Sequence, residues 1–411
     1  MPEVVSPQQI SEEEFADAAL EFLQANAKPR VEEKTGWGEG SDKVGLLSEK
    51  TKEEEIAEVT EAKAWRQKVF DAGFAWITGP TEYGGRGLPS SYERRYQAVE
   101  AAFDTPSQSP FGIGLGMVAP TILAHATPAV KDAYLRKLWR GEMIACQLFS
   151  EPVAGSDLAG LQTRADRDGD EWILNGQKVW TSNAQYSDIG EIICRTDPDA
   201  PKHKGLTGFV VNMRAPGVEV RPLRQMTGGA SFNEVFFTDV RVPDDHRLGD
   251  VNQGWTVALT TLMNERASIG GGGGGAGSIG SGRLIELMRH LGKDGDPIAR
   301  QAVVDIFINS KVSSYTSLRA MAKIKAGQLP GPEMSIAKLS LTQNLQRISN
   351  LVGMLLGPRL VADSGEWGTY AWSELVLGVP GMRVAGGTDE IMRNIVGERV
   401  LGLPKEPGLS K

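Results

Sequence analysis

The middle of this chain has a different hydrophobic pattern from its two flanks. Between residues 143 and 256, short runs rich in Val, Ile and Phe alternate with turn residues, which is typical of β-strands. Asn175-Gly176 lies between two such runs in residues 171–180, and this dipeptide is the strongest short signal for a hairpin turn. We therefore predict a compact β domain of about 110 residues, a small barrel or sandwich. Further strands are expected at 189–196, 206–213, 218–222 and 233–242, and Pro243 closes the last of them.

Both flanks have the spacing of amphipathic helices instead. In the first flank we expect helices over 11–28, 51–72, the residues up to Ala102, and 128–140, separated by glycine-rich loops at 30–50 and 80–87. In the second flank helical spacing covers 256–290, 296–325, 332–356 and 388–399. The predicted fold class is multidomain α+β. It comprises an all-helical N-terminal domain (1–142), a central β-barrel or sandwich domain (143–256) and a C-terminal four-helix-bundle domain (257–411).

Composition excludes several classes of protein. With 411 residues the chain can bury a large core, and a net charge of -8 without a basic block argues against nucleic-acid binding. Two cysteines, Cys146 and Cys194, cannot form a disulfide scaffold and fit a reducing cytoplasm. The four histidines are scattered without metal-ligand spacing, so no metal site is expected. No signal peptide is visible and no run of 18 apolar residues exists, so we expect no membrane span.

Residues 270–282 contain nine glycines, six of them consecutive from Gly270 to Gly275. One interpretation is a flexible linker. If the run is helical instead, each glycine costs about 0.8–1 kcal/mol relative to alanine, and such a cost would persist only where side chains cannot fit. Close helix packing or a widened ligand cavity would then explain the run.

Three motifs resemble the flavin-binding edge of the acyl-CoA dehydrogenase family. They are residues 149–157 (FSEPVAGSD), residues 178–183 (KVWTSN) and residues 386–394 (GGTDEIMRN), in the order and at the spacing found in that family. Weaker matches are residues 80–87 (PTEYGGRG) and 394–404 (NIVGERVLGLP). The resemblance covers essentially the whole chain. It implies an FAD-dependent oxidoreductase that introduces an α,β double bond into an acyl-CoA thioester, as in fatty acid β-oxidation and lipid metabolism.

The resemblance also implies roles for individual residues around the FAD. Ser150 and Ser182 match hydroxyls that hydrogen-bond the flavin ring, and Trp180 matches an aromatic residue beside that ring. Ser156 matches a serine that meets both the FAD and the substrate. Neutral donors stabilise the negative charge that hydride transfer leaves on a flavin. The remaining residues that the matched motifs place at the cofactor are Phe149, Thr181, Thr388 and Glu390, and Gly387 is placed at the substrate.

One position departs from the commonest family pattern. Most members carry the catalytic glutamate where this chain has Gly386, whose backbone N–H would still polarise the thioester carbonyl. A minority of the family carries the base on the helix that opens the C-terminal domain, and that position corresponds to Glu265 in the run LMNERA. We expect Glu265 to be the catalytic base, with a pKa that a desolvated pocket could raise. Arg266 matches an arginine near the CoA moiety, although both residues could also be surface groups of an ordinary helix.

Two further segments depart from the family. The segments that clasp the adenine end of a neighbouring subunit's FAD correspond to residues 288–297 and 352–358, and both have lost the family pattern. Either a homo-oligomer, typically a homotetramer, holds FAD through altered contacts, or the chain forms a hetero-oligomer with a paralogue that supplies the clasp. Electron-transferring flavoprotein is the electron acceptor that the resemblance implies.

Two other functions stay open at this point. A flavin oxidase or monooxygenase can be built on the same fold, because fold does not fix function. A non-catalytic subunit that stabilises a paralogue would explain the lost base and the lost clasp. The intact flavin edge and Glu265 favour the dehydrogenase.

Overall fold

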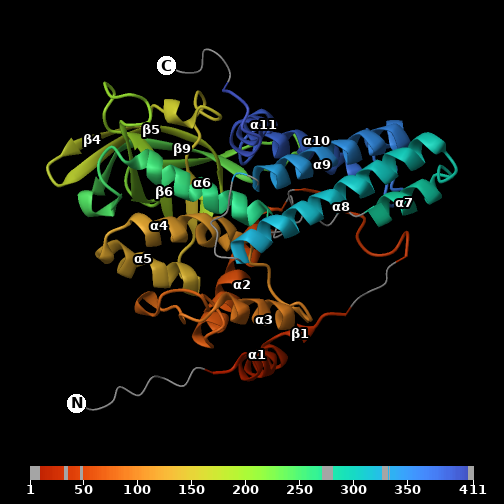
Figure 1. Cartoon of the computed structure of the whole chain (residues 1–411), viewed down its shortest axis with the longest axis horizontal. Helices are drawn as coiled ribbons and strands as arrows, with labels where there is room; N and C mark the ends of the chain where they lie inside the picture. Colours follow the sequence, from red (N-terminus) through yellow and green to blue (C-terminus); the bar gives the residue numbers. More distant parts are fainter. Residues whose placement is uncertain are drawn as a thin grey trace.

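The computed structural model describes residues 10–31, 36–46, 50–270, 281–325, 332 and 334–405. A helical layer near the N-terminus, a β-sheet and a long helical arm follow one another along the chain (Figure 1). This arrangement confirms the predicted order of a helical, a β and a second helical part.

The N-terminal helices begin at capping residues that the sequence provides. Ser11 and Glu14, and likewise Thr51 and Glu54, form reciprocal capping boxes at the starts of α1 and α2. Helix α5 begins with Pro128 at its first position and ends at Gly141, which has a left-handed φ of 82°. The elements are α1 (Glu12–Asn26), α2 (Lys52–Asp71), η1 (Thr81–Tyr83), α3 (Ser90–Glu100), η2 (Ser109–Phe111), the π-helix η3 (Gly114–Val118), α4 (Ala119–His125) and α5 (Pro128–Arg140).

A two-stranded sheet interrupts the helices of this part. Strand β1 (Lys28–Pro29) pairs antiparallel with β2 (Phe103–Asp104). The expectation that the first 142 residues are all-helical is therefore wrong in this detail. Two-residue strands carry too little periodic pattern to be detected from sequence.

The central domain contains one mixed sheet. Its strands are hydrogen-bonded in the order β10-β7-β6-β4-β5-β9-β8, and β3 pairs parallel with β6. The long antiparallel pairs β5–β9 and β6–β7 form most of its area. The strands are β3 (Ala145–Leu148), β4 (Arg164–Asp168), β5 (Glu171–Ser182), β6 (Ile189–Arg195), β7 (Leu206–Asn212), β8 (Val218–Leu223), β9 (Phe232–Pro243) and β10 (Arg247–Leu248).

The predicted hairpin at Asn175-Gly176 is wrong. Both residues lie inside the continuous strand β5, at a register shift in its pairing with β9. The Asn175 side chain accepts a hydrogen bond from the backbone N–H of Asp239, and a Cβ on Gly176 would lie 2.5 Å from the Thr163 hydroxyl oxygen. Glycine is therefore required here by a close approach within the sheet, and the dipeptide marks a bulge instead of a turn.

The C-terminal arm contains helices that pack along one another (Figure 1). Helix α10 was not predicted, because Gly378, Pro380 and Gly381 interrupt its pattern. The glycine run lies mostly outside the described residues; α6 ends at Gly270. The elements are α6 (Gly254–Gly270), α7 (Ser281–His290), α8 (Pro297–Lys325), α9 (Met334–Leu356), η8 (Gly357–Leu360), α10 (Trp372–Val384), α11 (Asp389–Ile395) and the π-helix η9 (Val396–Val400).

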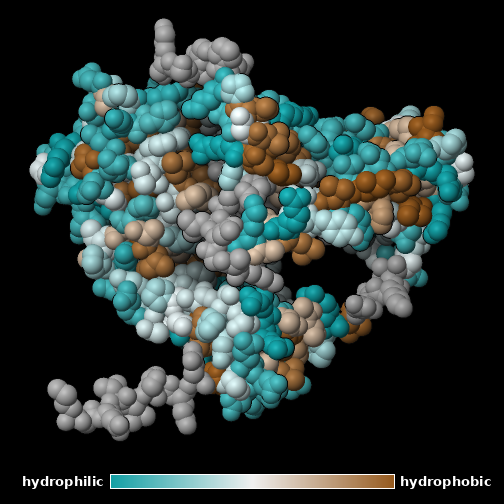
Figure 2. All heavy atoms as spheres, viewed as in Figure 1, coloured by the Kyte–Doolittle hydropathy of each residue, from teal (hydrophilic) through white to brown (hydrophobic). Residues whose placement is uncertain are grey.

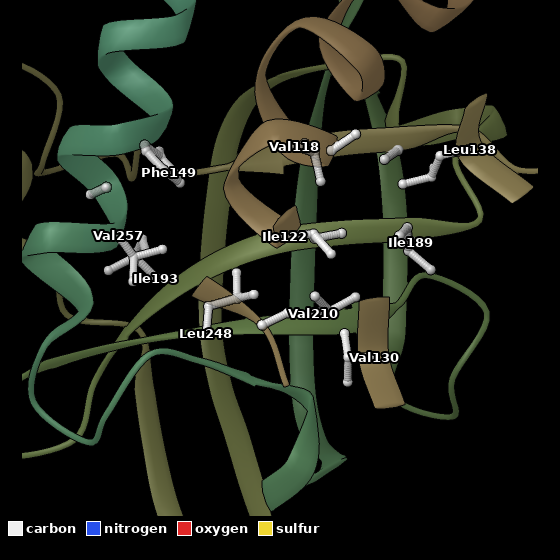
Figure 3. Packing of buried hydrophobic residues seen from close by; sticks show 14 of the residues in the cluster. Val118, Ile122, Val130, Leu138, Phe149, Ile189, Ile193, Val210, Leu248 and Val257 are labelled. Carbon is white, nitrogen blue, oxygen red and sulfur yellow. The ribbon is translucent and has the colours of Figure 1, made fainter. Parts of the chain in front are cut away.

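One buried core joins the sheet to helices from both flanks (Figure 3). Ile122 of α4, Ile189 and Ile193 of β6, and Val257 of α6 are almost completely buried in it. Truncating one such isoleucine to alanine costs about 2–5 kcal/mol. Helix α6 is therefore held between the sheet and α4, which fixes the position of its later turns.

The segment 36–46, named the strap below, crosses from the N-terminal part to the helical arm. The Trp37 ring stacks on the His290 imidazole with centroids 4.9 Å apart, and Arg283 of α7 donates to the Asp42 backbone oxygen at 2.6 Å. Val44 is buried in the core of the arm. The strap is a loop, as predicted, but its side chains cover the end of α7.

Candidate active site

Trp180 has the most unusual backbone in the matched flavin motifs. Its φ is +62°, in the left-handed region that a bulky residue adopts only at a cost of about 1–3 kcal/mol. The strain falls where β5 shifts register against β9 between Lys178 and Thr181. The side chain is 58% exposed and meets the Phe232 ring edge to face, with centroids 6.0 Å apart. A strained, exposed tryptophan at a bulge indicates a ligand-binding surface and not core packing.

A buried ion pair ties the first two motifs together. Lys178 Nζ donates to Glu151 Oε1 at 2.9 Å and to the Phe149 backbone oxygen at 3.0 Å. The Glu151 carboxylate also accepts the backbone N–H groups of Gln162 at 2.6 Å and Thr163 at 2.9 Å. Burial lowers the pKa of the completely buried Lys178 ammonium, while the Glu151 charge opposes this effect. The pair fixes the loop of the first motif against β5.

Neutral donors line the edge that this pair creates. The Ser150 backbone oxygen accepts from Val179 N–H at 2.9 Å, so Ser150 lies beside the residue that precedes Trp180. Ser150 and Ser182 are half-buried and Ser156 is exposed. Their hydroxyls and the exposed ring suit the polar edge and the flat face of a flavin, so this donor set fits FAD.

Phe149 and Thr181 belong to the floor of the site. Phe149 is buried in the core that also holds Val257 and Ala258 of α6, and Figure 3 shows it beside that helix. Thr181 is buried, and its hydroxyl has no partner among the described residues. Phe149 therefore links the flavin motif to the helix that carries Glu265.

The third motif forms a tight turn before α11. Gly386 and Gly387 have φ values of 64° and 91°, which only glycine adopts without strain. A Cβ on Gly387 would lie 2.6 Å from the Met392 methyl carbon. Thr388 caps α11 by accepting from Ile391 N–H. Glu390 is exposed and pairs with Arg393 at 3.4 Å, so its side chain lies at the surface.

A buried charge cluster holds this turn. Lys338 of α9 donates to the Gly387 backbone oxygen at 2.6 Å and lies 3.5 Å from Asp389. Asp389 also accepts from the Thr342 hydroxyl at 2.7 Å and from Arg383 at 2.8 Å. Burial tends to raise the pKa of Asp389, but Thr342 and Arg383 hold it below its usual value. The cluster fixes the Gly387 carbonyl, in the residue that follows Gly386.

Glu265 and Arg266 lie on α6. Glu265 is half-buried, and the side chain of Arg266 lies outside the described residues. Helix α6 packs against β6, β7, α4, the π-helix η3 and α9. Glu265 therefore lies on the helix that packs against Phe149 of the flavin motif. This helix also contacts α9, which carries Lys338, the donor to the turn at Gly386 and Gly387.

Residues 288–297 and 352–358 correspond to the family segments that contact the adenine end of a neighbour's FAD. In this chain both contribute residues to packing within the chain itself. Met288 is buried in the core of the arm, and His290 is covered by Trp37 and pairs with Glu366 at 3.0 Å. Val352 and Leu356 are buried in the same core. The strap therefore occupies the end of α7 where the family pattern would place the clasp.

Sequence reasoning missed the supporting residues of the site. Glu151 and Lys178 stand inside the first two motifs, but their pairing cannot be seen until strands are placed. Lys338 and Asp389 are 51 residues apart in the chain and gave no spacing signal. A buried lysine next to a motif glycine is visible only in three dimensions.

Comparisons with known proteins agree with this geometry. Models of the N-terminal, middle and C-terminal domains of acyl-CoA dehydrogenases match residues 10–142, 146–240 and 252–401. The chain is 35% identical over 353 residues to acyl-CoA dehydrogenase IpdE1 of Mycobacterium tuberculosis, covering 84% of this chain and 89% of that protein.

Two solved structures are similar in fold. A variant of the Tcur3481-Tcur3483 steroid ACAD superposes with a TM-score of 0.70 and 26% identity, covering 85% of this chain and 94% of that chain. The ChsE4-ChsE5 complex from Mycobacterium tuberculosis superposes with a TM-score of 0.67 and 24% identity, covering 99% and 100%.

The neutral donor edge fits a flavoenzyme, and the matched domain models and relatives give its class, an oxidoreductase acting on CH–CH donors. With all three domain models matched in order, the chain belongs to the acyl-CoA dehydrogenase family. FAD is its cofactor and acyl-CoA dehydrogenation its reaction. Among the described residues, no helix is both long and apolar enough to span a membrane.

Proposed function

We propose that Glu265 is the catalytic base of α,β-dehydrogenation and that the Gly386 N–H polarises the thioester carbonyl. The observation that supports this most is the position of Glu265 on α6, the helix that packs on the Phe149 floor and beside α9. Position 386 carries no carboxylate, so the base that removes the α proton must lie elsewhere in the site.

In this proposal each residue has a separate task. Glu265 takes the α proton while the Gly386 amide stabilises the charge that builds on the carbonyl oxygen. The hydride acceptor for the β hydrogen would be supplied by FAD, so the product would be the trans-2-enoyl-CoA. Ser150 and Ser182 would hold the ring of FAD, Trp180 would lie beside it, and Ser156 would contact both FAD and substrate. Gly387, Thr388, Glu390 and Arg266 complete the proposed contacts to substrate and cofactor.

The test of the base is flavin reduction in the Glu265→Gln variant. The variant should still bind FAD. Mixed anaerobically with acyl-CoA, its rate of flavin bleaching should be lower by about 10³-fold or more, because amides accept protons poorly. Glu286→Gln on α7, an exposed glutamate, is the matched control and should bleach normally. Normal bleaching of Glu265→Gln would overturn the assignment. Reoxidation of the reduced enzyme by air within one turnover would indicate the oxidase instead.

We propose a bulky or polycyclic acyl group as the substrate class. The π-helix η3, which contains Gly114 and Gly116, packs against α6 and β3. One of the two similar solved structures, the Tcur3481-Tcur3483 variant, is named as a steroid ACAD. A panel of octanoyl-CoA, 4-cyclohexylbutanoyl-CoA and a fused-ring acyl-CoA would decide: fastest bleaching by the fused-ring thioester supports the proposal, and fastest bleaching by octanoyl-CoA contradicts it.

We also propose that the chain assembles with a paralogue in preference to forming a homotetramer. The strap covers the end of α7, so that end cannot clasp a neighbour's FAD as the family pattern does. Hydrophobic side chains gather on the helical arm (Figure 2). On α8 the exposed ones include Val304, Phe307, Ile308, Val312, Tyr315 and Leu318, which a partner subunit would bury.

The hetero-oligomer predicts one FAD per pair of chains. Counting FAD by absorbance in the chain expressed alone, and then co-expressed with a paralogue, separates the assemblies. A colourless chain that gains FAD only with the partner supports the proposal, whereas one FAD per chain in a homotetramer contradicts it.

The remaining proposals concern the cellular setting. We propose electron-transferring flavoprotein as the electron acceptor, as the resemblance to the acyl-CoA dehydrogenase family implies. We place the enzyme in the cytoplasm, in lipid degradation by β-oxidation. Cys146 and Cys194 are free and buried, which suits a reducing compartment. The proposed domain boundaries are 142/143 and 256/257.

A further inference from the structure

Glu191 is a buried carboxyl group that the proposed reaction does not use. It lies in the middle of β6 and is completely buried. Its Oε1 atom accepts from the Thr261 hydroxyl at 2.5 Å, and its Oε2 atom has no partner among the described residues. An ionised carboxylate in such a place would cost several kcal/mol unless it were paired.

The partner of Glu191 connects three parts of the chain. Thr261 lies on α6, and its hydroxyl is 2.9 Å from the Thr121 hydroxyl of α4. Both threonines are completely buried. One small cluster therefore joins the N-terminal helices, the sheet and the first helix of the arm. Thr261 precedes Glu265 by four residues, which is one helical turn on the same face of α6.

No cation of the described chain neutralises Glu191. Strand β7, which pairs residue 210 with residue 191, carries no ionisable residue, and the β3 neighbour is Gln147. On α4 the nearest ionisable group is His125, which bonds the Thr260 hydroxyl of α6 at 2.8 Å. Burial, with a smaller contribution from Lys131, lowers the pKa of His125, so this group is neutral near pH 7.

The charged side chains that the structure describes on β6 and α6 do not neutralise Glu191 either. Arg195 ends β6 and donates to backbone oxygens, among them Ala159 O at 2.6 Å. On α6 the ionisable group one turn beyond Thr261 is Glu265 itself, whose negative charge would oppose a second one. Burial raises the pKa of Glu191 to about 8.

Protonation gives a hydrogen to each contact that joins β6, α6 and α4. With a proton on Glu191 Oε1, its O–H donates to the Thr261 hydroxyl, which can then donate to the Thr121 hydroxyl 2.9 Å away. Thr121 donates to the Met117 backbone oxygen at 2.8 Å in either state. Without that proton, the Thr261 hydroxyl must donate to the carboxylate, so the contact between Thr261 of α6 and Thr121 of α4 has no donor, and a buried charge is left without a cation.

We propose that Glu191 is a positioning residue: as a neutral acid it fastens α6, and with it Glu265, to the sheet and to α4. This inference rests on the proposed role of Glu265. Raising the pH ionises Glu191, loosens α6 and misplaces the base. Flavin reduction then falls on the alkaline side, in addition to the acid-side fall that protonation of the base causes.

The test compares pH profiles of anaerobic flavin reduction for the assembled holoenzyme, with the fastest acyl-CoA of the panel above. In the unaltered enzyme the rate should fall by about fivefold from pH 8 to pH 9, following a single ionisation near 8. Glu191→Gln keeps a neutral side chain of the same shape. Its rate near pH 7 should stay within about threefold, and the alkaline fall should disappear. Thr260→Val, which removes the His125 contact at the same helix interface, should keep the fall.

Two results would overturn the proposal. One is an unchanged alkaline fall in Glu191→Gln; the other is loss of reduction near pH 7 as complete as in Glu265→Gln. A second readout is independent of the reaction. Thermal stability of the unaltered protein should decline relative to Glu191→Gln between about pH 4.5 and about pH 8, because the folded state holds this proton more tightly. Normal flavin reduction by Glu265→Gln would refute the base assignment. Parallel curves of stability against pH for the unaltered protein and Glu191→Gln would separately refute the proposal for Glu191.

Discussion

The buried Glu151–Lys178 pair allows a quantitative test of how the flavin edge is held. Replacing Glu151 by Gln removes the one carboxylate that bonds Lys178 among the described residues and leaves a completely buried ammonium group. Breaking one side of a buried pair costs about 3–5 kcal/mol. At about 2–4 °C per kcal/mol, Tm should fall by about 6–20 °C. The Ser150 loop should also detach from β5, so FAD should be lost more readily.

The matched variants separate charge from shape. Lys178→Met leaves the Glu151 carboxylate with the N–H donors of Gln162 and Thr163, so it should cost less than Glu151→Gln. The double variant Glu151→Gln with Lys178→Met buries no net charge and should recover part of the loss. The assay is thermal unfolding with flavin fluorescence as the probe. A cost below about 1 kcal/mol for Glu151→Gln, or strict additivity of the two changes, would refute the reasoning.

The same pair fixes a pH dependence with a definite sign. Burial acts to raise the pKa of Glu151, but the Lys178 charge and the bonds from Thr163 and Gln162 hold it below its usual value. A carboxyl group with a lowered pKa contributes stability that is present above its unfolded pKa and is lost as pH falls through the folded one. The unaltered protein should therefore lose stability at acid pH more steeply than the double variant, as unfolding curves below about pH 4.5 would show.

Three further substitutions test the strained and braced positions. Gly387→Ala forces alanine to φ +91° and should destabilise the chain by about 1–3 kcal/mol in unfolding measurements; no change would mean that the turn adapts. Lys338→Met removes the donor to the Gly387 oxygen and should slow flavin reduction by about 10–100-fold with FAD still bound, whereas an unchanged rate would exclude a positioning role. Trp180→Gly relieves the backbone strain and should raise unfolding stability while weakening FAD binding, and equal FAD affinity would show that the ring does not meet the cofactor.

Much of the fold could be predicted because its signals are local. Period and capping residues located α1, α2, α5 and most strands, as in the Thr51–Glu54 box before α2. The hairpin prediction failed because Asn175-Gly176 has the composition of a turn, but Gly176 is needed for a close approach to Thr163. Helix α10 was missed because Pro380 hides its period.

The candidate site divides in the same way. Its motif residues, such as Ser150 and Trp180, are contiguous in sequence and could be found there. The groups that hold them come from distant segments: Lys338 supports Gly387, and Thr261 and Thr121 meet Glu191. Such pairings depend on how helices dock on the sheet, which no periodic pattern encodes.

The most direct test of the central claim is exchange of the substrate's α proton with solvent. An acyl-CoA with sulfur in place of the β carbon can be deprotonated at the α carbon but cannot be dehydrogenated. In deuterium oxide, the unaltered enzyme with bound FAD should exchange the α proton, and Glu265→Gln should reduce the rate by about 10³-fold or more while Glu286→Gln leaves it unchanged. Exchange at the normal rate in Glu265→Gln would contradict the assignment of the base.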